Sequence, residues 1–105
     1  MTGLWEQTVT RYRSDGSRLV LTHCVYQWKD KKEEGSRFVR EFLLLVPGAA
    51  DLLPGDRIWV GEGPENLDWE RDVPVAVPGL SQVGWVRQCP VGGQIHHTEA
   101  GDWRR

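Results

Sequence analysis

The stretch that decides the fold reads Leu52-Leu53-Pro54-Gly55-Asp56-Arg57-Ile58-Trp59-Val60-Gly61-Glu62-Gly63. Pro54 and Gly55 form a turn pair, because Pro presets φ at the second turn position and Gly accepts a positive φ at the third. Asp56 can bond back to nearby backbone N–H groups and fix the corner. Residues 58–60 then read as a short, half-buried strand. We therefore expect Pro54, Gly55 and Asp56 to form a structural turn.

Strand-forming sequence precedes this corner. Residues 5–13 and 18–28 are rich in Thr, Val and Tyr, and Asp15-Gly16 between them predicts a tight hairpin turn. Residues 37–46 predict a third strand, whose alternation places Phe38, Phe42, Leu44 and Val46 on one face. Unbroken alternation along the second strand places Val20, Thr22, Cys24, Tyr26 and Trp28 on one face and Leu19, Leu21, His23 and Val25 on the other. Because both faces are largely apolar, we expect part of this strand to be covered on both sides.

Residues 29–36 contain three acids and three bases. In the isolated chain such a segment predicts a solvated, mobile hairpin loop. The functional alternative is a contact arm that becomes ordered on assembly. The candidate residues of this contact hairpin are Lys29, Lys31, Lys32, Glu33 and Glu34.

A long acidic loop follows the corner. Residues 61–79 contain five acids and one base, a local charge of −4. Their three prolines forbid a central strand, and loops of this length are usually functional or disordered. Trp69 and the period-two residues Val73, Val75 and Val77 predict that part of the segment is anchored as an edge strand. The candidate channel or contact residues are Glu62, Glu65, Asp68, Trp69, Glu70 and Asp72.

The remaining sequence completes an all-β pattern. Residues 80–88 predict a fifth strand, in which Gly84 indicates a bulge or a close backbone approach. Residues 95–99 predict a short last strand and 100–105 a tail. No stretch has a sustained helical period. About six short strands with Gly/Pro turns predict one domain over residues 1–105, a small barrel with little or no helix and flexible tips at 29–36 and 61–79. We favour a closed barrel because closure removes exposed edges.

Composition limits the class of protein. The chain has 105 residues, 39% of them hydrophobic, and a net charge of −2, so it is globular and lacks the basic surface of a nucleic-acid binder. The longest apolar run is too short to span a membrane, and the N-terminus lacks the features of a signal peptide, so we expect the chain to stay in the cytoplasm. Cys24 and Cys89 are expected to be small buried hydrophobes, with a disulfide left open. Six tryptophans predict core filling.

Neither a catalytic nor a metal-binding motif emerges. His96 and His97 are adjacent in a predicted strand and so should point to opposite faces. A third metal ligand would have to come from His23, Cys24, Cys89 or Glu99. None of these spacings matches an established metal motif. We therefore expect a non-enzymatic protein with no catalytic residues, no cofactor and no metal.

The order of landmarks resembles the small head-completion proteins of long-tailed bacteriophages and prophages, which are also described as stopper-like minor capsid or head–tail connector proteins. The resembling segments are 4–12 (LWEQTVTRY), 24–28 (CVYQW), 42–47 (FLLLVP), 54–58 (PGDRI), 83–86 (VGWV) and the strand containing His96-His97. Together they span most of the chain as a pattern of turns and strands.

The resemblance implies a structural virion protein at the head–tail joint. Its protomers would be made in the bacterial cytoplasm, with a monomeric state before assembly left open. They would form a ring beneath the portal and adaptor, where they would retain packaged DNA and offer the tail a docking platform. DNA would pass through without specific binding, and no membrane would be involved. By position, residues 61–79 would project into the channel, with 29–36 as the second candidate.

Two alternatives belong to other classes of protein. A small Trp-rich module that binds carbohydrate or peptide predicts several exposed tryptophans on one face. A small metal-dependent hydrolase predicts a pocket in which His23, His96, His97 and the acidic loop converge.

Overall fold

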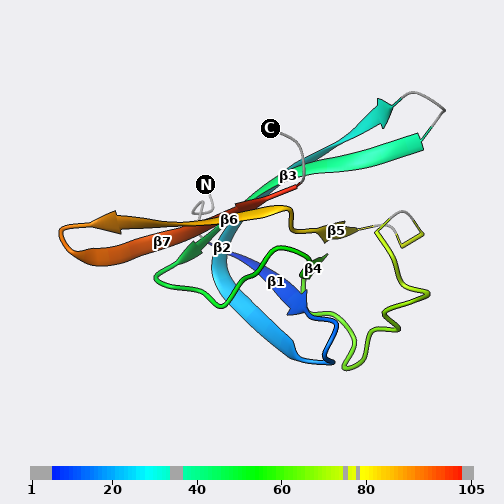
Figure 1. Ribbon diagram of the computed structural model, residues 1–105, viewed down its shortest axis with the longest axis horizontal. Coiled ribbons are helices and arrows are strands. Elements are labelled where there is room, and N and C mark those ends of the chain that lie inside the picture. Colours follow the sequence, from blue (N-terminus) through cyan, green and yellow to red (C-terminus); the bar gives the residue numbers. More distant parts are fainter. Residues whose placement is uncertain (1–5, 34–36, 75, 78, 103–105) are drawn as a thin grey trace.

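One antiparallel sheet contains every strand of the computed structural model (Figure 1), which describes residues 6–33, 37–74, 76–77 and 79–102. For residues 30–33 and 37–40 only the backbone is described. The seven strands are β1 (Gln7–Tyr12), β2 (Arg18–Glu33), β3 (Arg37–Pro47), β4 (Arg57–Val60), β5 (Leu80–Gln82), β6 (Trp85–Val91) and β7 (Gln94–Gly101). Their order across the sheet is β5-β4-β1-β2-β3-β7-β6. The prediction of an all-β fold is confirmed, with seven strands in place of about six.

The extra strand arises where the predicted fifth strand divides. Val83 and Gly84 separate β5 from β6, although these strands are the two ends of the sheet. Val83 exchanges backbone hydrogen bonds with the corner, accepting from Gly55 N at 2.7 Å and donating to Asp56 O at 2.8 Å. Gly84 N donates to Gly101 O at 2.7 Å. The chain therefore crosses from one end of the sheet to the other within two residues, and the sheet curls into a half-barrel. The expectation of a closed barrel is wrong, because among the described residues β5 and β6 remain the two ends of the sheet and do not pair with each other.

A β-bulge changes the face that β2 presents to the core. Val9 of β1 pairs with Leu21, whereas Gln7 pairs with Cys24, so β2 has one extra residue in this interval. Within it, His23 adopts a positive φ of 59°. An extra residue reverses the alternation of side chains beyond it. Leu21 and Cys24 consequently both lie in the core, and the prediction that they face opposite sides of β2 is wrong.

The core fills the inside of the curl. Its apolar members are Val9, Leu21, Cys24, Tyr26, Phe42, Leu44, Val46, Leu52, Ile58, Val83 and Ala100. The Tyr26 and Phe42 rings stack at 5.6 Å, and the Tyr26 hydroxyl meets Ser81 Oγ at 3.0 Å. β1 is buried from Val9 to Tyr12 on both of its faces. These contacts place the core under the centre of the sheet.

Two hairpins extend from this centre (Figure 1). The outer parts of β2 and β3 form one arm, here called the β2–β3 arm (residues 28–42), and β6 and β7 form a second, the β6–β7 arm (residues 87–97), on the opposite side. The prediction that residues 29–36 form a loop is wrong for 29–33, since β2 continues to Glu33 and pairs it with Arg37. The backbone register also pairs Asp30 with Arg40, so the ladder is continuous along this part of the hairpin. Residues 34–36, including Glu34, lie outside the described residues.

The Pro54-Gly55-Asp56 corner forms as predicted. Asp56 N donates to Leu53 O at 3.1 Å, and Gly55 has a φ of 97°. The Asp56 carboxylate accepts from Leu53 N at 2.8 Å and from Arg13 Nε at 2.8 Å. Arg13 also donates to Asp51 at 3.0 Å, which completes a group here called the corner cluster (Arg13, Asp51, Asp56). The hydrogen bond to Asp56, followed by that to Asp51, raises the pKa of Arg13.

Candidate functional site

The first residues of the acidic loop (residues 61–79) are hydrogen-bonded to a buried threonine of β1. Thr10, which is fully buried, donates through Oγ1 to Gly61 O at 2.8 Å and accepts from Gly63 N at 2.9 Å. A Cβ at Gly63 would lie 2.9 Å from Trp59 Cγ, so this position requires glycine. Thr10 therefore fixes where the loop leaves β4.

A second attachment holds the next residue of the loop. Pro64 O accepts hydrogen bonds from the Tyr12 hydroxyl and from Arg18 Nε, the latter at 2.9 Å. Arg18 also donates to Gly63 O at 2.6 Å and lies 3.8 Å from the Glu62 carboxylate. The first turn of the loop is thus tied to both β1 and β2.

Arg57 anchors the middle of the loop from β4. Its side chain donates through Nη1 to Trp69 O at 2.5 Å and to Asp72 O at 3.2 Å. The Arg57 Cζ atom lies 3.8 Å from the Trp69 ring centroid, a cation–π contact. Burial lowers the pKa of Arg57, and the nearby Asp72 charge opposes that effect. Trp69 is thus held against β4 by these contacts from within a turn, whereas the prediction had placed it with an edge strand.

Two of the predicted acidic residues stabilise the loop itself. Asp68 accepts through Oδ1 from the backbone N–H groups of Glu70 and Arg71, at 3.2 and 3.1 Å. Asp72 accepts from Asp68 N at 2.9 Å. The expected edge strand does not form in the described part of residues 73–77, since Ala76 N and Val77 N both donate to Val73 O in a local turn. Val75 lies outside the described residues.

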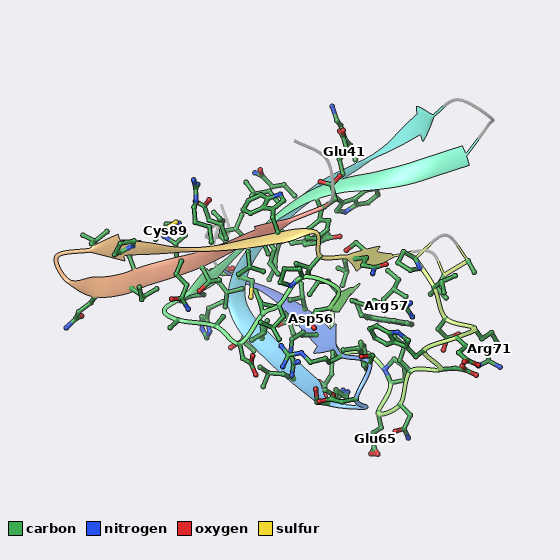
Figure 2. The ribbon with its side chains drawn as sticks, in the orientation of Figure 1. Glu41, Asp56, Arg57, Glu65, Arg71 and Cys89 are labelled. Carbon is green, nitrogen blue, oxygen red and sulfur yellow. The ribbon has the colours of Figure 1, made fainter. Side chains whose placement is uncertain are left out.

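The other acidic residues face solvent. Glu62, Glu65 and Glu70 are exposed, and Figure 2 shows Glu65 pointing away from the sheet at the edge of the molecule. Among the described residues, neither Glu65 nor Glu70 has an ion-pair partner. The acidic residues of the loop therefore form two groups: aspartates that hydrogen-bond to the loop backbone and glutamates that point into solvent.

The β2–β3 arm carries the one exposed tryptophan within the described residues. Trp28 is 51% exposed at the root of the arm and lines a shallow hollow with Phe42 and Asp102. Next to it, Lys29 Nζ lies 3.6 Å from Glu41. The side chains of the other candidates on the arm, Lys31, Lys32 and Glu33, are not described. The arm thus presents an exposed aromatic at its base.

A further group of polar side chains lies on the β6–β7 arm. Cys89 pairs with His97 across the two strands, and Arg87 pairs with Glu99, which places four side chains together. His97 Nε2 lies 3.0 Å from Glu99 Oε2, and Arg87 Nη2 donates to Glu99 Oε1 at 2.5 Å. We call Arg87, Cys89, His97 and Glu99 the hairpin cluster. The hydrogen bond from His97, followed by that from Arg87, lowers the pKa of Glu99.

The prediction that His96 and His97 point apart is wrong, because their Nδ1 atoms lie 2.9 Å apart. The register explains the difference: Cys89 pairs with His97 and Pro90 with Ile95, so His96 is an extra residue on β7. A bulge re-aims the side chain that it inserts. Cys89 and Glu99 were considered as ligands beside His96 and His97, but sequence spacing does not reveal the strand pairing that brings Cys89, His97 and Glu99 together.

Arg18 and Arg57 were also not identified from the sequence as residues that hold the acidic loop. Both are arginines at the first position of a strand, and that weak signal becomes informative only when the loop is seen to pack beside them. The two cysteines are free. The expectation that both are buried is confirmed for Cys24 and is wrong for Cys89, which is half-buried.

Comparison with protein-family models, characterised proteins and solved structures yields no match. In the part of the chain that the structure describes, no helix is long and apolar enough to cross a membrane.

Proposed function

We propose that this chain is a structural protomer of a bacteriophage head–tail joint, which assembles into a ring around the DNA channel. The observation that carries the proposal is the acidic loop, which is fastened to the sheet yet directs its glutamates outward. Thr10, Arg18 and Arg57 hold its backbone, while Glu65 and Glu70 remain exposed. A fastened acidic surface would line a channel and repel phosphate, so that DNA would pass without binding.

The two arms supply the surfaces that a ring protomer needs. A head-to-tail ring joins two different faces of each subunit. The β2–β3 and β6–β7 arms extend from opposite sides of the sheet (Figure 1) and differ in sequence. Trp28, exposed beside the hollow at the root of the first arm, is the residue we expect to become buried on assembly, since aromatic side chains are enriched in protein interfaces. The portal, its adaptor and the tail would be the partners above and below the ring.

The test uses the phage or prophage that carries the gene. Electron microscopy of particles with the gene deleted should show heads without DNA or tails beside free tails. Complementation with Trp28→Ala should restore fewer tailed particles than complementation with the wild-type gene. Intact tailed particles in the deletion would overturn the proposal.

The channel surface has a separate test. Glu65→Gln/Glu70→Gln and Glu65→Lys/Glu70→Lys form a charge series, and both variants leave the loop contacts of Asp68 and Asp72 intact. DNA retention and ejection should change in graded fashion along the series, more with Lys than with Gln. Unchanged retention and ejection in the Lys variant would remove the loop from the channel.

The two alternatives receive less support. A Trp-rich binding module requires clustered exposed tryptophans, but Trp59, Trp69 and Trp85 are only partly exposed. The hydrolase requires His23 and the acidic loop to converge with His96 and His97. Among the described residues, the group of candidate metal ligands contains neither His23 nor an acid of the loop.

A further inference from the structure

The hairpin cluster gathers three different metal-ligand types on one surface. Cys89 and His97 are paired across β6 and β7, and Glu99 lies two residues beyond His97 along β7. Side chains two residues apart on a strand share a face, and a directly paired residue joins them there. One donor atom from each residue lies within 4.8 Å of the other two. We propose that Cys89, His97 and Glu99 form a binding site for a divalent cation of the Zn²⁺ class.

The distances suit a tetrahedral ion. Zn²⁺ binds S, N and O donors at roughly 2.0–2.3 Å, which places donors about 3.3–3.8 Å apart around a tetrahedron. His97 Nε2 and Glu99 Oε2 are already 3.0 Å apart. Small side-chain rotations therefore bring the whole set into range. All three residues are partly exposed, so the ion has a path from solvent.

The donor types select the class of metal. A thiolate and an imidazole favour Zn²⁺ and its borderline-soft neighbours over Mg²⁺ and Ca²⁺, which prefer oxygen ligands. A Cys89 thiolate and a Glu99 carboxylate, with a neutral His97, balance the charge of a divalent ion. On binding, the thiol proton of Cys89 leaves to solvent and sulfur donates its electron pair to the metal.

The surrounding residues already orient two of the ligands. His97 would bind the metal through Nε2, the nitrogen nearest Glu99, and its Nδ1–H would donate to His96 Nδ1, 2.9 Å away. Metal-binding histidines commonly donate their second ring N–H in this manner. Arg87 holds Glu99 through Oε1, which leaves Oε2 for the ion. Three protein ligands would leave the fourth position to water or to a ligand from another molecule.

The site is separable from the fold, because none of its members belongs to the apolar core. The full chain, reduced and free of chelator, should bind one equivalent of Zn²⁺ by calorimetry. Co²⁺ should bind at the same site and give the ultraviolet charge-transfer band of a thiolate ligand. Cys89→Ser should abolish that band.

Variants separate ligands from supporting residues. Removal of an outer-shell partner costs roughly 10- to 100-fold in metal affinity, so loss of a ligand by Cys89→Ser, His97→Gln or Glu99→Gln should cost at least about 100-fold. His96→Gln should weaken binding about tenfold. His23→Asn is the matched control, since His23 is an exposed histidine outside the cluster and Asn tolerates its positive φ.

Protection of Cys89 gives a readout that does not depend on the variants' folding. Zn²⁺ should slow alkylation of Cys89 in the wild-type chain, and Mg²⁺ should not. The proposal is overturned if Zn²⁺ does not bind stoichiometrically, or if it binds equally well to Cys89→Ser and His97→Gln.

Discussion

The corner cluster and the hairpin cluster both contain an arginine that pairs with a carboxylate, yet their surroundings differ. In the corner cluster, the Asp56 side chain is 2% exposed and also accepts from Leu53 N. In the hairpin cluster, the Arg87 side chain is 68% exposed and the Glu99 carboxylate pairs with the side chains of Arg87 and His97. The buried Asp56 carboxylate thus satisfies a partly buried backbone N–H as well as Arg13, whereas the hairpin charges satisfy one another at the surface.

This difference separates structural from functional polar groups. Asp56 lies where β4 begins and where the two ends of the sheet approach each other through Val83. Its removal would leave Arg13 without its principal partner and Leu53 N without an acceptor. None of the four residues of the hairpin cluster belongs to the apolar core, so its side chains are available to an ion. Variants can test both halves of this statement.

The largest effect is expected at the corner. Asp56→Ala should lower the free energy of unfolding by about 3 kcal/mol, because it removes one partner of a largely buried ion pair and a backbone acceptor. Glu99→Gln, measured in chelator, should cost about 1 kcal/mol or less, as expected of a surface pair. Denaturant unfolding of both variants is the measurement. Equal losses would show that the hairpin cluster is as structural as the corner.

A glycine at the base of the β6–β7 arm sharpens the boundary between the two regions. Gly101 pairs with Trp85 and with Leu43, and a Cβ there would lie 2.6 Å from the Trp85 ring. Gly101→Ala should therefore cost about 2 kcal/mol through overpacking. The same unfolding experiment measures it. If the loss of unfolding free energy were as small as that of Glu99→Gln, the base of the arm would be able to accommodate a methyl group at Gly101.

One thiol lies in the core and the other on the β6–β7 arm, so their titration and reactivity compare these two regions directly. Burial raises the pKa of Cys24 to about 11, against an ordinary value of 9.0, whereas Cys89 is half-buried. The raised pKa stabilises the fold below pH 9, and this contribution is lost as the pH rises through 11. The loss is on the order of 2 kcal/mol. Between pH 8 and pH 11, the free energy of unfolding should fall more steeply for the wild-type chain than for Cys24→Ala.

Alkylation of the native chain provides the complementary check. Cys89 should react rapidly and Cys24 only after unfolding, which peptide mass spectrometry can distinguish. Rapid modification of Cys24 in the native chain would contradict its placement in the core.

Local signals predicted the corner and most of the strands. The Pro54-Gly55 turn, the Asp15-Gly16 hairpin and the alternation of Phe42, Leu44 and Val46 each depend on residues close in sequence. The structure bears out all three, with Gly16 at a φ of 93°, Gly55 at 97° and the three core residues buried. These features fix the all-β fold without knowledge of strand pairing.

The candidate sites were less predictable because they depend on register. The extra residue in β2 moved Cys24 to the face of Leu21, and the extra residue in β7 turned His96 toward His97. Neither bulge has a glycine or proline at the inserted position to signal it. The composition of the acidic loop was clear from the sequence, but the structural use of Asp68 and Asp72 required knowledge of its turn.

The smallest effect is expected in the titration of Glu99, and it tests how the hairpin cluster is ordered. The pKa of Glu99 is lowered chiefly by His97 and next by Arg87. The resulting stability is present above the ordinary value of 4.5 and is lost as the pH falls through the lowered pKa. By carboxyl NMR, His97→Gln should return the pKa of Glu99 further toward 4.5 than Arg87→Gln does. The opposite order would mean that Arg87 alone positions the carboxylate. Oε2 would then lack the orientation toward His97 that distinguishes this cluster from an ordinary surface ion pair.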